Sequence, residues 1–257
     1  MTNGLWYDTF YEAVEKSKAY VSYCAQAFGR DFSQQGFSNM EQLEFMLEKV
    51  RLQPNGKVLD VGCGNGKMVE YIASTQDVIG CGFDISGTAI EAANKRTAGK
   101  ENLFFRKGSI NDIDYEEQSF DAVLSVDTLY FADDLLRILR KILRWVKPGG
   151  CFAAYFSEFR LSNDDPLNKL TPHGTGLAKA LKEGQIPYKV FDLTKSHYDV
   201  MRRKRIVLSG MKQEFEAEKT MILFDNANTE SIDEDMSYEN FTKFSARYLY
   251  VVKKAGQ

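Results

Sequence analysis

The sequence contains the segment KVLDVGCGNGK at residues 57–67. Its first part, from Val58 to Val61, is apolar and partly β-branched, which predicts a short buried strand. Glycine at every second position from Gly62 to Gly66 lets the backbone turn tightly and approach a ligand closely. Residues 67–72 then have the pattern of a helix that begins directly after the turn. A strand, a glycine turn and a helix are typical of the nucleotide-binding half of a doubly wound α/β fold.

The spacing of these glycines argues against a dinucleotide. A pyrophosphate-binding turn follows the pattern G-x-G-x-x-G, whereas this chain has G-x-G-x-G, with Lys67 at the place of the third glycine. Asp60, at the end of the strand, would repel a pyrophosphate at the helix N-terminus. The same carboxylate would attract an ammonium or a sulfonium group, so a nicotinamide-dependent oxidoreductase is strongly disfavoured.

Four motifs occur in a fixed order between about residues 51 and 157. They are Asp60-x-Gly62-x-Gly64-x-Gly66, residues 78–86 with Asp84 at the end of a strand, residues 120–127, and residues 147–156 with their Lys-Pro-Gly-Gly turn. In this order and spacing the chain resembles the class I S-adenosylmethionine-dependent methyltransferases. The resemblance implies a Rossmann-like α/β fold with a doubly wound, mostly parallel seven-stranded sheet.

The chain outside these motifs is expected to complete one methyltransferase domain over residues 1–257. Residues 1–50 are expected to form an N-terminal helical cap, in which Ser38 and Glu41 make a capping box. Residues 51–194 and 246–254 are expected to form the Rossmann-like core. Residues 195–245 look helical and form an insertion before the last strand that is unusually long for a connection, which we interpret as a substrate lid.

The resemblance also implies S-adenosylmethionine as the cofactor and a place for each of its parts. It assigns the ribose to Asp84, the methionine end to Asp60 and the glycine loop, and the thioether to Ser125 and Val126. Many relatives carry an acid for the adenine after the third strand, where this chain has Ser109, with Asp112 as a substitute. The expected cofactor-binding residues are Tyr11, Asp60, Gly62, Cys63, Gly64, Gly66, Asp84, Ile85, Ser109, Ile110, Ser125 and Val126.

The N-terminal segment is rich in aromatic residues up to Phe37. The resemblance suggests that Tyr11, or the loop of residues 32–37, closes over the methionine end of the cofactor. Packing in a helical core is the alternative interpretation of each aromatic residue. Cys63, in the glycine loop, is interpreted as a small residue beside the backbone and not as a redox centre.

Ligands of open parallel sheets bind outside the carboxyl ends of the strands. One crevice is therefore expected to contain Asp127, Tyr130, Tyr155, Ser157, Glu158, Thr194, His197 and Tyr198. Methyl transfer from a sulfonium needs mainly alignment, and a base only where the acceptor must lose a proton. His197 is the first candidate base and Tyr130 the second, with Tyr198, Glu158 and His173 as alternatives, and a mechanism without any catalytic residue stays open.

Composition narrows the class of partner. The 33 basic and 36 acidic residues give a formal net charge of −3, which offers nucleic acid no general attraction. Two histidines and four scattered cysteines predict no metal site. With no signal-peptide pattern and no long apolar run, we expect a cytoplasmic protein without a membrane partner.

The expected function is methyl transfer to a small-molecule acceptor in a lidded crevice. An RNA or protein methyltransferase is a second hypothesis, based on the basic run at residues 202–205, although acidic residues follow it closely. The third hypothesis is a protein that binds S-adenosylmethionine without transferring its methyl group.

Overall fold

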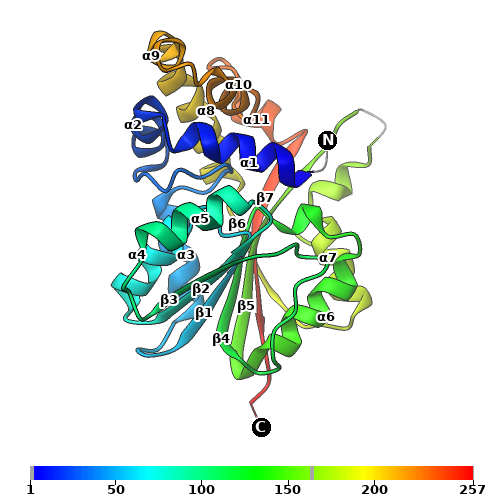
Figure 1. The fold of residues 1–257 in the computed structure, drawn as a ribbon. Helices are drawn as coiled ribbons and strands as arrows, with labels where there is room; N and C mark the ends of the chain where they lie inside the picture. The colour runs from blue at the N-terminus through cyan, green and yellow to red at the C-terminus, as the bar shows by residue number, and fades with distance from the viewer. Residues whose placement is uncertain (1–2, 163–164, 257) are drawn as a thin grey trace.

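The computed structural model describes residues 3–162 and 165–256. A seven-stranded sheet with the order β3-β2-β1-β4-β5-β7-β6 forms its centre (Figure 1). The strands are β1 (Lys57–Val61), β2 (Ile79–Asp84), β3 (Leu103–Lys107), β4 (Phe120–Val126), β5 (Val146–Phe159), β6 (Lys189–Asp192) and β7 (Ser245–Lys253). Only β7 runs antiparallel to its neighbours, β5 and β6. This arrangement confirms the expected fold class.

Helices cover both faces of the sheet. One face packs against α3 (Met40–Val50), α4 (Lys67–Gln76) and α5 (Gly87–Arg96), and the other against α6 (Leu135–Trp145) and α7 (Gly176–Glu183). Because β1 lies between two apolar layers, its residues from Val58 to Val61 are all buried. Two short 3₁₀ helices, η1 (Leu129–Phe131) and η2 (Leu167–Leu170), follow β4 and β5.

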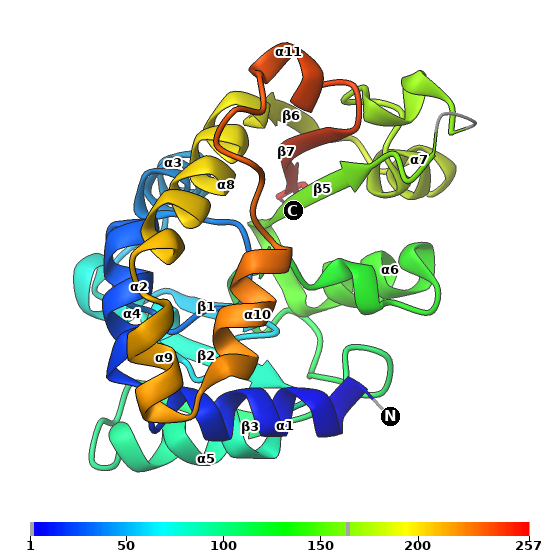
Figure 2. The ribbon, with the colours of Figure 1, turned by 90° about the horizontal axis from the view of Figure 1, so that it is seen from above.

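Six further helices lie above the carboxyl ends of the strands, on the upper side of the sheet in Figure 1. They are α1 (Asn3–Val14), α2 (Lys18–Phe28), α8 (Thr194–Ser209), α9 (Lys212–Glu218), α10 (Met221–Thr229) and α11 (Tyr238–Phe241). The N-terminal helices and most of the insertion share one apolar cluster, in which Phe10, Tyr20 and Phe28 pack near Phe215 and Leu223. Figure 2 shows this layer from above, where α10 contacts α8, α9 and α1.

The helix before β1 begins differently from the expectation. Its N-cap is Asn39, whose side chain accepts a hydrogen bond from the amide of Gln42, so the predicted capping box of Ser38 and Glu41 is wrong. The physical reason is a competing partner, because the Ser38 hydroxyl accepts a hydrogen bond from Arg247 at 2.6 Å. The cap at residues 1–50 and the lid at 195–245 stay predictions as domain boundaries, and residues 1, 2 and 257 lie outside the described part.

Candidate cofactor site

Two adjoining pockets open at the carboxyl ends of β1, β2 and β4. We call them the Asp60 pocket and the Asp84 pocket; they have volumes of about 590 and 820 Å³, including space open to solvent. Both pockets are lined by Tyr11, Gln35, Gly62, Val126 and Asp127. These shared residues, which we call the junction, make the two pockets one elongated site of a size suited to a small organic ligand.

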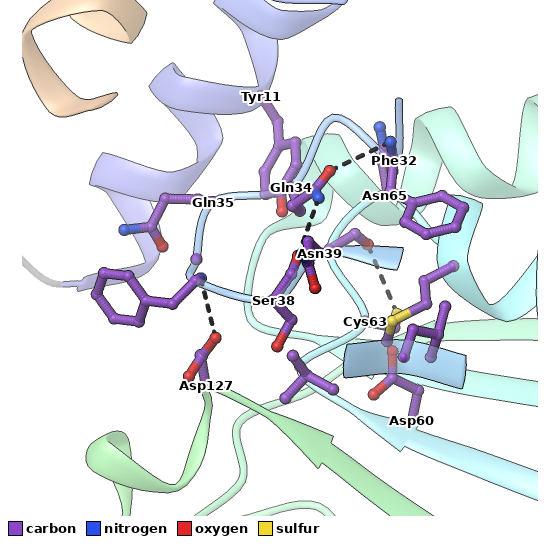
Figure 3. A pocket seen from close by; sticks show the side chains of 17 residues that line it. Tyr11, Phe32, Gln34, Gln35, Ser38, Asn39, Asp60, Cys63, Asn65 and Asp127 are labelled. Carbon is purple, nitrogen blue, oxygen red and sulfur yellow. Dashed lines mark hydrogen bonds between the residues drawn. The ribbon is translucent and has the colours of Figure 1, made fainter. Parts of the chain in front are cut away.

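Asp60 is the principal charged group of the Asp60 pocket. Its side chain is 2% exposed, and neither carboxylate oxygen has a hydrogen-bond partner among the described residues. Burial and the nearby Asp84 raise the pKa of Asp60 to about 7. A buried acid with no partner is costly, and a cationic ligand group would satisfy it. Figure 3 shows Tyr11 reaching down from α1 on the opposite side of this pocket.

Asn65 supplies an unpaired donor to the same pocket. Its Oδ1 accepts a 3.4 Å hydrogen bond from the Lys67 amide, which sets the orientation of the side-chain amide. Its Nδ2 is buried without a partner in the described part of the chain, and Asn65 lines the Asp60 pocket. An unpaired acid and an unpaired amide donor together complement the ammonium and the carboxylate of an amino acid.

Asp84, at the end of β2, organises the Asp84 pocket. One carboxylate oxygen accepts a hydrogen bond from the Gly64 amide and the other from the Ser86 amide, each at 2.9 Å. Burial raises the pKa of Asp84. The pocket continues past Ile85 to Ser109 and Ile110, which follow β3. A strand-end acid held in this way can accept further hydrogen bonds from ligand hydroxyl groups.

Two glycines in the loop after β1 lie so close to neighbouring side chains that any side chain at either position would collide with them. A Cβ atom at Gly62 would lie 2.2 Å from the Thr128 hydroxyl, and one at Gly64 would lie 2.2 Å from the Tyr11 hydroxyl. Both residues also have positive φ angles, +75° and +54°. The glycine spacing therefore serves the close approach of η1 and α1 to the loop.

The cap closes the site from above. Tyr7 and Tyr11 extend from α1, and the loop of residues 32–39 crosses the Asp60 pocket (Figure 3). The Gln35 side chain accepts a 3.3 Å hydrogen bond from the Tyr7 hydroxyl and donates one to Glu230, which follows α10. Tyr11 and residues of this loop line the Asp60 pocket, and their closure over the methionine end of the cofactor stays a prediction.

A buried ion pair forms the wall beside the junction. The Arg247 guanidinium donates to both carboxylate oxygens of Asp127, at 2.5 and 3.0 Å, and also to Gln42, Ser157 and Ser38. Asp127 accepts a further hydrogen bond from the Phe37 amide at 3.1 Å. Because of these bonds, β4, β7, α3 and the loop over the pocket are joined at one point.

Most of the expected cofactor residues line the two pockets. They are Tyr11, Asp60, Gly62, Cys63, Gly64, Asp84, Ile85, Ser109, Ile110 and Val126. Gly66 and Ser125 line neither pocket. Gly66 packs against Phe105, where a Cβ atom would come within 2.6 Å, and Ser125 is buried inside β4. Asp112 also lies outside both linings, so Ser109 and Asn111 are the polar residues after β3 that line the Asp84 pocket.

The expectation of a single crevice containing eight residues is wrong for most of them, because only Asp127 lines a pocket. The Tyr155 hydroxyl donates to the Gln42 carbonyl, Ser157 accepts from Arg247, and Glu158 accepts from the Gly176 amide. The reason is that α3, α7 and α8 pack over the ends of β5, β6 and β7. Thr194, on α8, is buried by this packing.

The two candidate bases have different surroundings. His197 is fully buried against Phe37, Phe159 and Phe241, and burial together with Arg247 and Lys204 lowers its pKa well below the usual value. It lines neither pocket, so this geometry does not support it as a base. The Tyr130 hydroxyl accepts a 2.5 Å hydrogen bond from the Ser157 amide and lies 3.4 Å from a carboxylate oxygen of Asp127. Tyr130 itself lines neither pocket, so it contacts the site through Asp127.

The alternative bases are also engaged elsewhere. The Tyr198 hydroxyl donates to the Met236 carbonyl, and the exposed His173 contacts the Tyr188 hydroxyl. Several polar residues of the site were absent from the sequence-based set, namely Tyr7, Asn39, Asn65, Asn111, Thr128 and Asp133. Asn65 could have been found from its place within the glycine loop, whereas the others are positioned by tertiary contacts.

Comparison with known proteins finds methyltransferases. A family model described as "Methyltransferase domain" matches residues 59–154. Phosphoethanolamine N-methyltransferase 1 of Arabidopsis thaliana is 32% identical over 149 residues, which cover 58% of this chain and 30% of that protein. Sterol 24-C-methyltransferase of Candida albicans is 35% identical over 114 residues, covering 43% and 30%. The chain thus spans about 30% of the length of these curated relatives.

Solved structures show the same fold at low sequence identity. A phosphoethanolamine N-methyltransferase 2 of Haemonchus contortus, in complex with phosphomonomethylethanolamine and S-adenosylhomocysteine, has a TM-score of 0.72 at 15% identity, covering 97% of this chain and 60% of that one. Coclaurine N-methyltransferase, bound to N-methylheliamine and S-adenosylhomocysteine, has a TM-score of 0.65 at 18% identity, covering 93% and 78%. Within residues 3–162 and 165–256, no helix is both long and apolar enough to cross a membrane. Residues 59–154 thus match a methyltransferase domain, and the chain is similar in sequence and fold to class I S-adenosylmethionine-dependent methyltransferases.

Proposed function

We propose that this chain transfers a methyl group from S-adenosylmethionine to a small-molecule acceptor. The observation that carries the proposal is the pair of strand-end acids, Asp60 and Asp84, in adjoining pockets at the carboxyl ends of β1 and β2. A ligand with a ribose and a cationic amino-acid end would satisfy both. S-adenosylmethionine supplies an activated methyl group on a sulfonium.

In this proposal each group of the site has a binding or positioning role. Asp84 accepts hydrogen bonds from the ribose hydroxyls, and Ser109 and Ile110 contact the adenine. Asp60 binds the ammonium of the methionine end, and the Asn65 amide donates to its carboxylate. Tyr11 and the loop at 32–39 exclude water, and alignment at the junction supplies about 7–11 kcal/mol of barrier lowering.

Similarity to small-molecule methyltransferases supports the acceptor class. The relatives and neighbours act, by name, on phosphoethanolamine, a sterol and coclaurine. The basic run at residues 202–205 suggested an RNA or protein acceptor. This support is weakened, because the run is largely engaged in contacts within the molecule. Lys204 is buried against Glu230, Arg205 pairs with Asp233, and Arg202 donates to the Glu234 carbonyl. The expected cytoplasmic location stays a prediction.

The proposal is tested by calorimetric titration with S-adenosylmethionine, S-adenosylhomocysteine and NAD. Wild-type protein should bind the first two and not the third. Asp84→Ala should weaken both by about 10- to 100-fold, because it removes charge-assisted hydrogen bonds worth about 1.5–3 kcal/mol. Asp235→Ala, at an exposed aspartate before α11, is the matched control and should bind as wild type does.

Affinity of Asp84→Ala within twofold of wild type would contradict the ribose assignment. Transfer of a labelled methyl group to small acceptors then separates an enzyme from a protein that only binds the cofactor. Activity on RNA that falls steeply with salt would support the second hypothesis instead.

A further inference from the structure

The junction of the two pockets is the place where an acceptor would meet the methyl group. If adenosine occupies the Asp84 pocket and the amino-acid end occupies the Asp60 pocket, the sulfonium between them lies at the junction. This step rests on the proposed function. The acceptor must then reach the surfaces of Tyr11, Gln35 and Asp127, and it meets the electrostatic environment that the surrounding side chains create.

The charged side chains of the site are all acidic. Among the described residues, the linings of the two pockets contain four aspartates and no lysine, arginine or histidine. The four are Asp60, Asp84, Asp127 and Asp133. Asp60 has no partner for either carboxylate oxygen within the described structure and lines the pocket, so this set includes a buried group that a ligand would have to satisfy.

The two buried cations behind the junction already have anionic partners. Arg247 is fully buried and donates to both oxygens of Asp127. The Lys204 ammonium, 1% exposed, lies 3.0 Å from a Glu230 carboxylate oxygen and 3.3 Å from the Gly36 carbonyl. Neither cation lines a pocket, so neither offers the charge that a phosphate group of an acceptor requires.

The pKa values of two tyrosine hydroxyls indicate that the site disfavours an anionic oxygen. Burial, then Glu230 and Asp84, raise the pKa of Tyr7, and burial followed by Asp84 raises that of Tyr11. A hydroxyl acceptor at the junction would experience the same acids and the same loss of water. Forming an alkoxide or phenolate nucleophile there is therefore disfavoured.

An amine forms no anion at this step: its ammonium form first releases one proton to water, and the neutral amine is then the nucleophile. Its lone pair forms the new N–C bond while the S–C bond breaks and its electron pair stays on sulfur. The positive charge passes from sulfur to nitrogen and stays in the acidic site, and the product ammonium can then release a proton to water. Tyr11 lines the junction, and an aromatic ring there can offer additional attraction to a cation.

We propose that the acceptor is an amine without a phosphate or other strongly anionic group, and that it is methylated on nitrogen at the junction. Tyr11 and Gln35 line its place, and no side-chain cation of the described lining opposes its cationic product. This acceptor class differs from the one named in the phosphoethanolamine N-methyltransferases, which the chain resembles over 149 residues.

Matched acceptors test the proposal. The full chain is saturated with S-adenosylhomocysteine, and its melting temperature is measured with ethanolamine, phosphoethanolamine, phenethylamine, 2-phenylethanol, larger secondary amines and inorganic phosphate. The same organic compounds are then incubated with S-adenosylmethionine carrying a labelled methyl group. We expect at least one phosphate-free amine to stabilise the complex and to be methylated at least about tenfold faster than its phosphate-bearing or alcohol counterpart.

Variants at the junction add a control. Gln35→Lys places a cation beside the acceptor, whereas Gln35→Met keeps a neutral side chain of similar length. We expect the amine affinity of Gln35→Lys to be at least about tenfold weaker than that of Gln35→Met. Equal affinity in the two variants, preference for a phosphate-bearing acceptor or an alcohol, or transfer to no amine would each overturn the proposal. Failure to bind S-adenosylmethionine would instead contradict the proposed function.

Discussion

Two sets of buried acids around the candidate site differ in their partners. Asp60 and Asp84 are 2% and 9% exposed, and no side-chain cation contacts either of them within the described residues. Asp127 and Glu230 are similarly enclosed, with side chains 6% and 15% exposed, but each has a buried cation at 3.0 Å or less. The difference separates Asp60 and Asp84, whose charges no side-chain cation compensates, from Asp127 and Glu230, whose charges are compensated within the protein.

The contrast has an energetic basis. Removing a carboxylate from water costs several kcal/mol unless a cation and hydrogen bonds compensate it. At Asp127 the Arg247 guanidinium supplies both. At Asp60 the cost instead appears as a pKa raised to about 7. An unpaired acid is therefore a position where the fold gives up stability and a ligand can restore it.

The largest expected effect comes from removing the cation of the buried pair between Asp127 and Arg247. Arg247→Met leaves Asp127 buried without its cation, which should lower the free energy of unfolding by about 3–5 kcal/mol. Urea denaturation measures this loss. Arg203→Met, at an exposed arginine of α8, is the matched control and should change stability by less than about 0.5 kcal/mol. A loss below about 1 kcal/mol for Arg247→Met would show that the pair does not hold the wall.

The next effect has the opposite sign. Asp60→Asn removes a buried acid whose pKa is about 7 in the folded protein and about 4 when unfolded. The folded state of wild type holds the extra proton between these values, so its stability falls as pH rises from 4 to 7. We expect Asp60→Asn to be about 2–4 kcal/mol more stable than wild type at pH 8, with the gain absent at pH 4.

Denaturation at the two pH values measures this difference, and S-adenosylmethionine binding should weaken in the same variant. A pH-independent change in stability would mean that Asp60 titrates normally in the folded protein. Asp235→Asn, exposed before α11, controls for a general effect of removing one acid.

A smaller effect is expected at the second ion pair. Glu230→Gln leaves the buried Lys204 ammonium with the Gly36 carbonyl and a neutral amide, which should cost about 1–3 kcal/mol of stability. The double variant Lys204→Met with Glu230→Gln should recover part of that loss, because no unpaired charge is left. Equal stability of Glu230→Gln and wild type would indicate that the pair contributes nothing measurable.

The cofactor half of the site could be predicted from the sequence because its determinants are local. Gly62 and Gly64 lie within five residues of Asp60, and Asp84 follows a recognisable strand. Backbone geometry at a strand end places such residues in the same way in any sheet of this class. The fold class was predictable for the same reason, since four ordered motifs cover β1, β2, β4 and β5.

The other half depends on contacts that no local pattern reveals. Asp127 and Arg247 are 120 positions apart, and Gln35 and Glu230 are 195 apart. His197 follows β6 as expected, but α8 turns its ring into an aromatic cluster with Phe37 and Phe241 instead of toward the site. Pairing and packing of this kind depend on the whole chain, so sequence patterns placed the wrong residues in the crevice.

Calorimetric titration of S-adenosylmethionine at pH 6.5, in two buffers with different protonation enthalpies, tests most directly whether the unpaired acids form the cofactor site. Binding should draw the Asp60 pKa down from about 7, so wild type should release about half a proton or more per ligand bound. Asp60→Asn should bind more weakly and lose this release. The α-amino group of the cofactor is almost fully protonated at this pH and offsets little of it. No binding, or binding whose heat is the same in both buffers, would contradict the account.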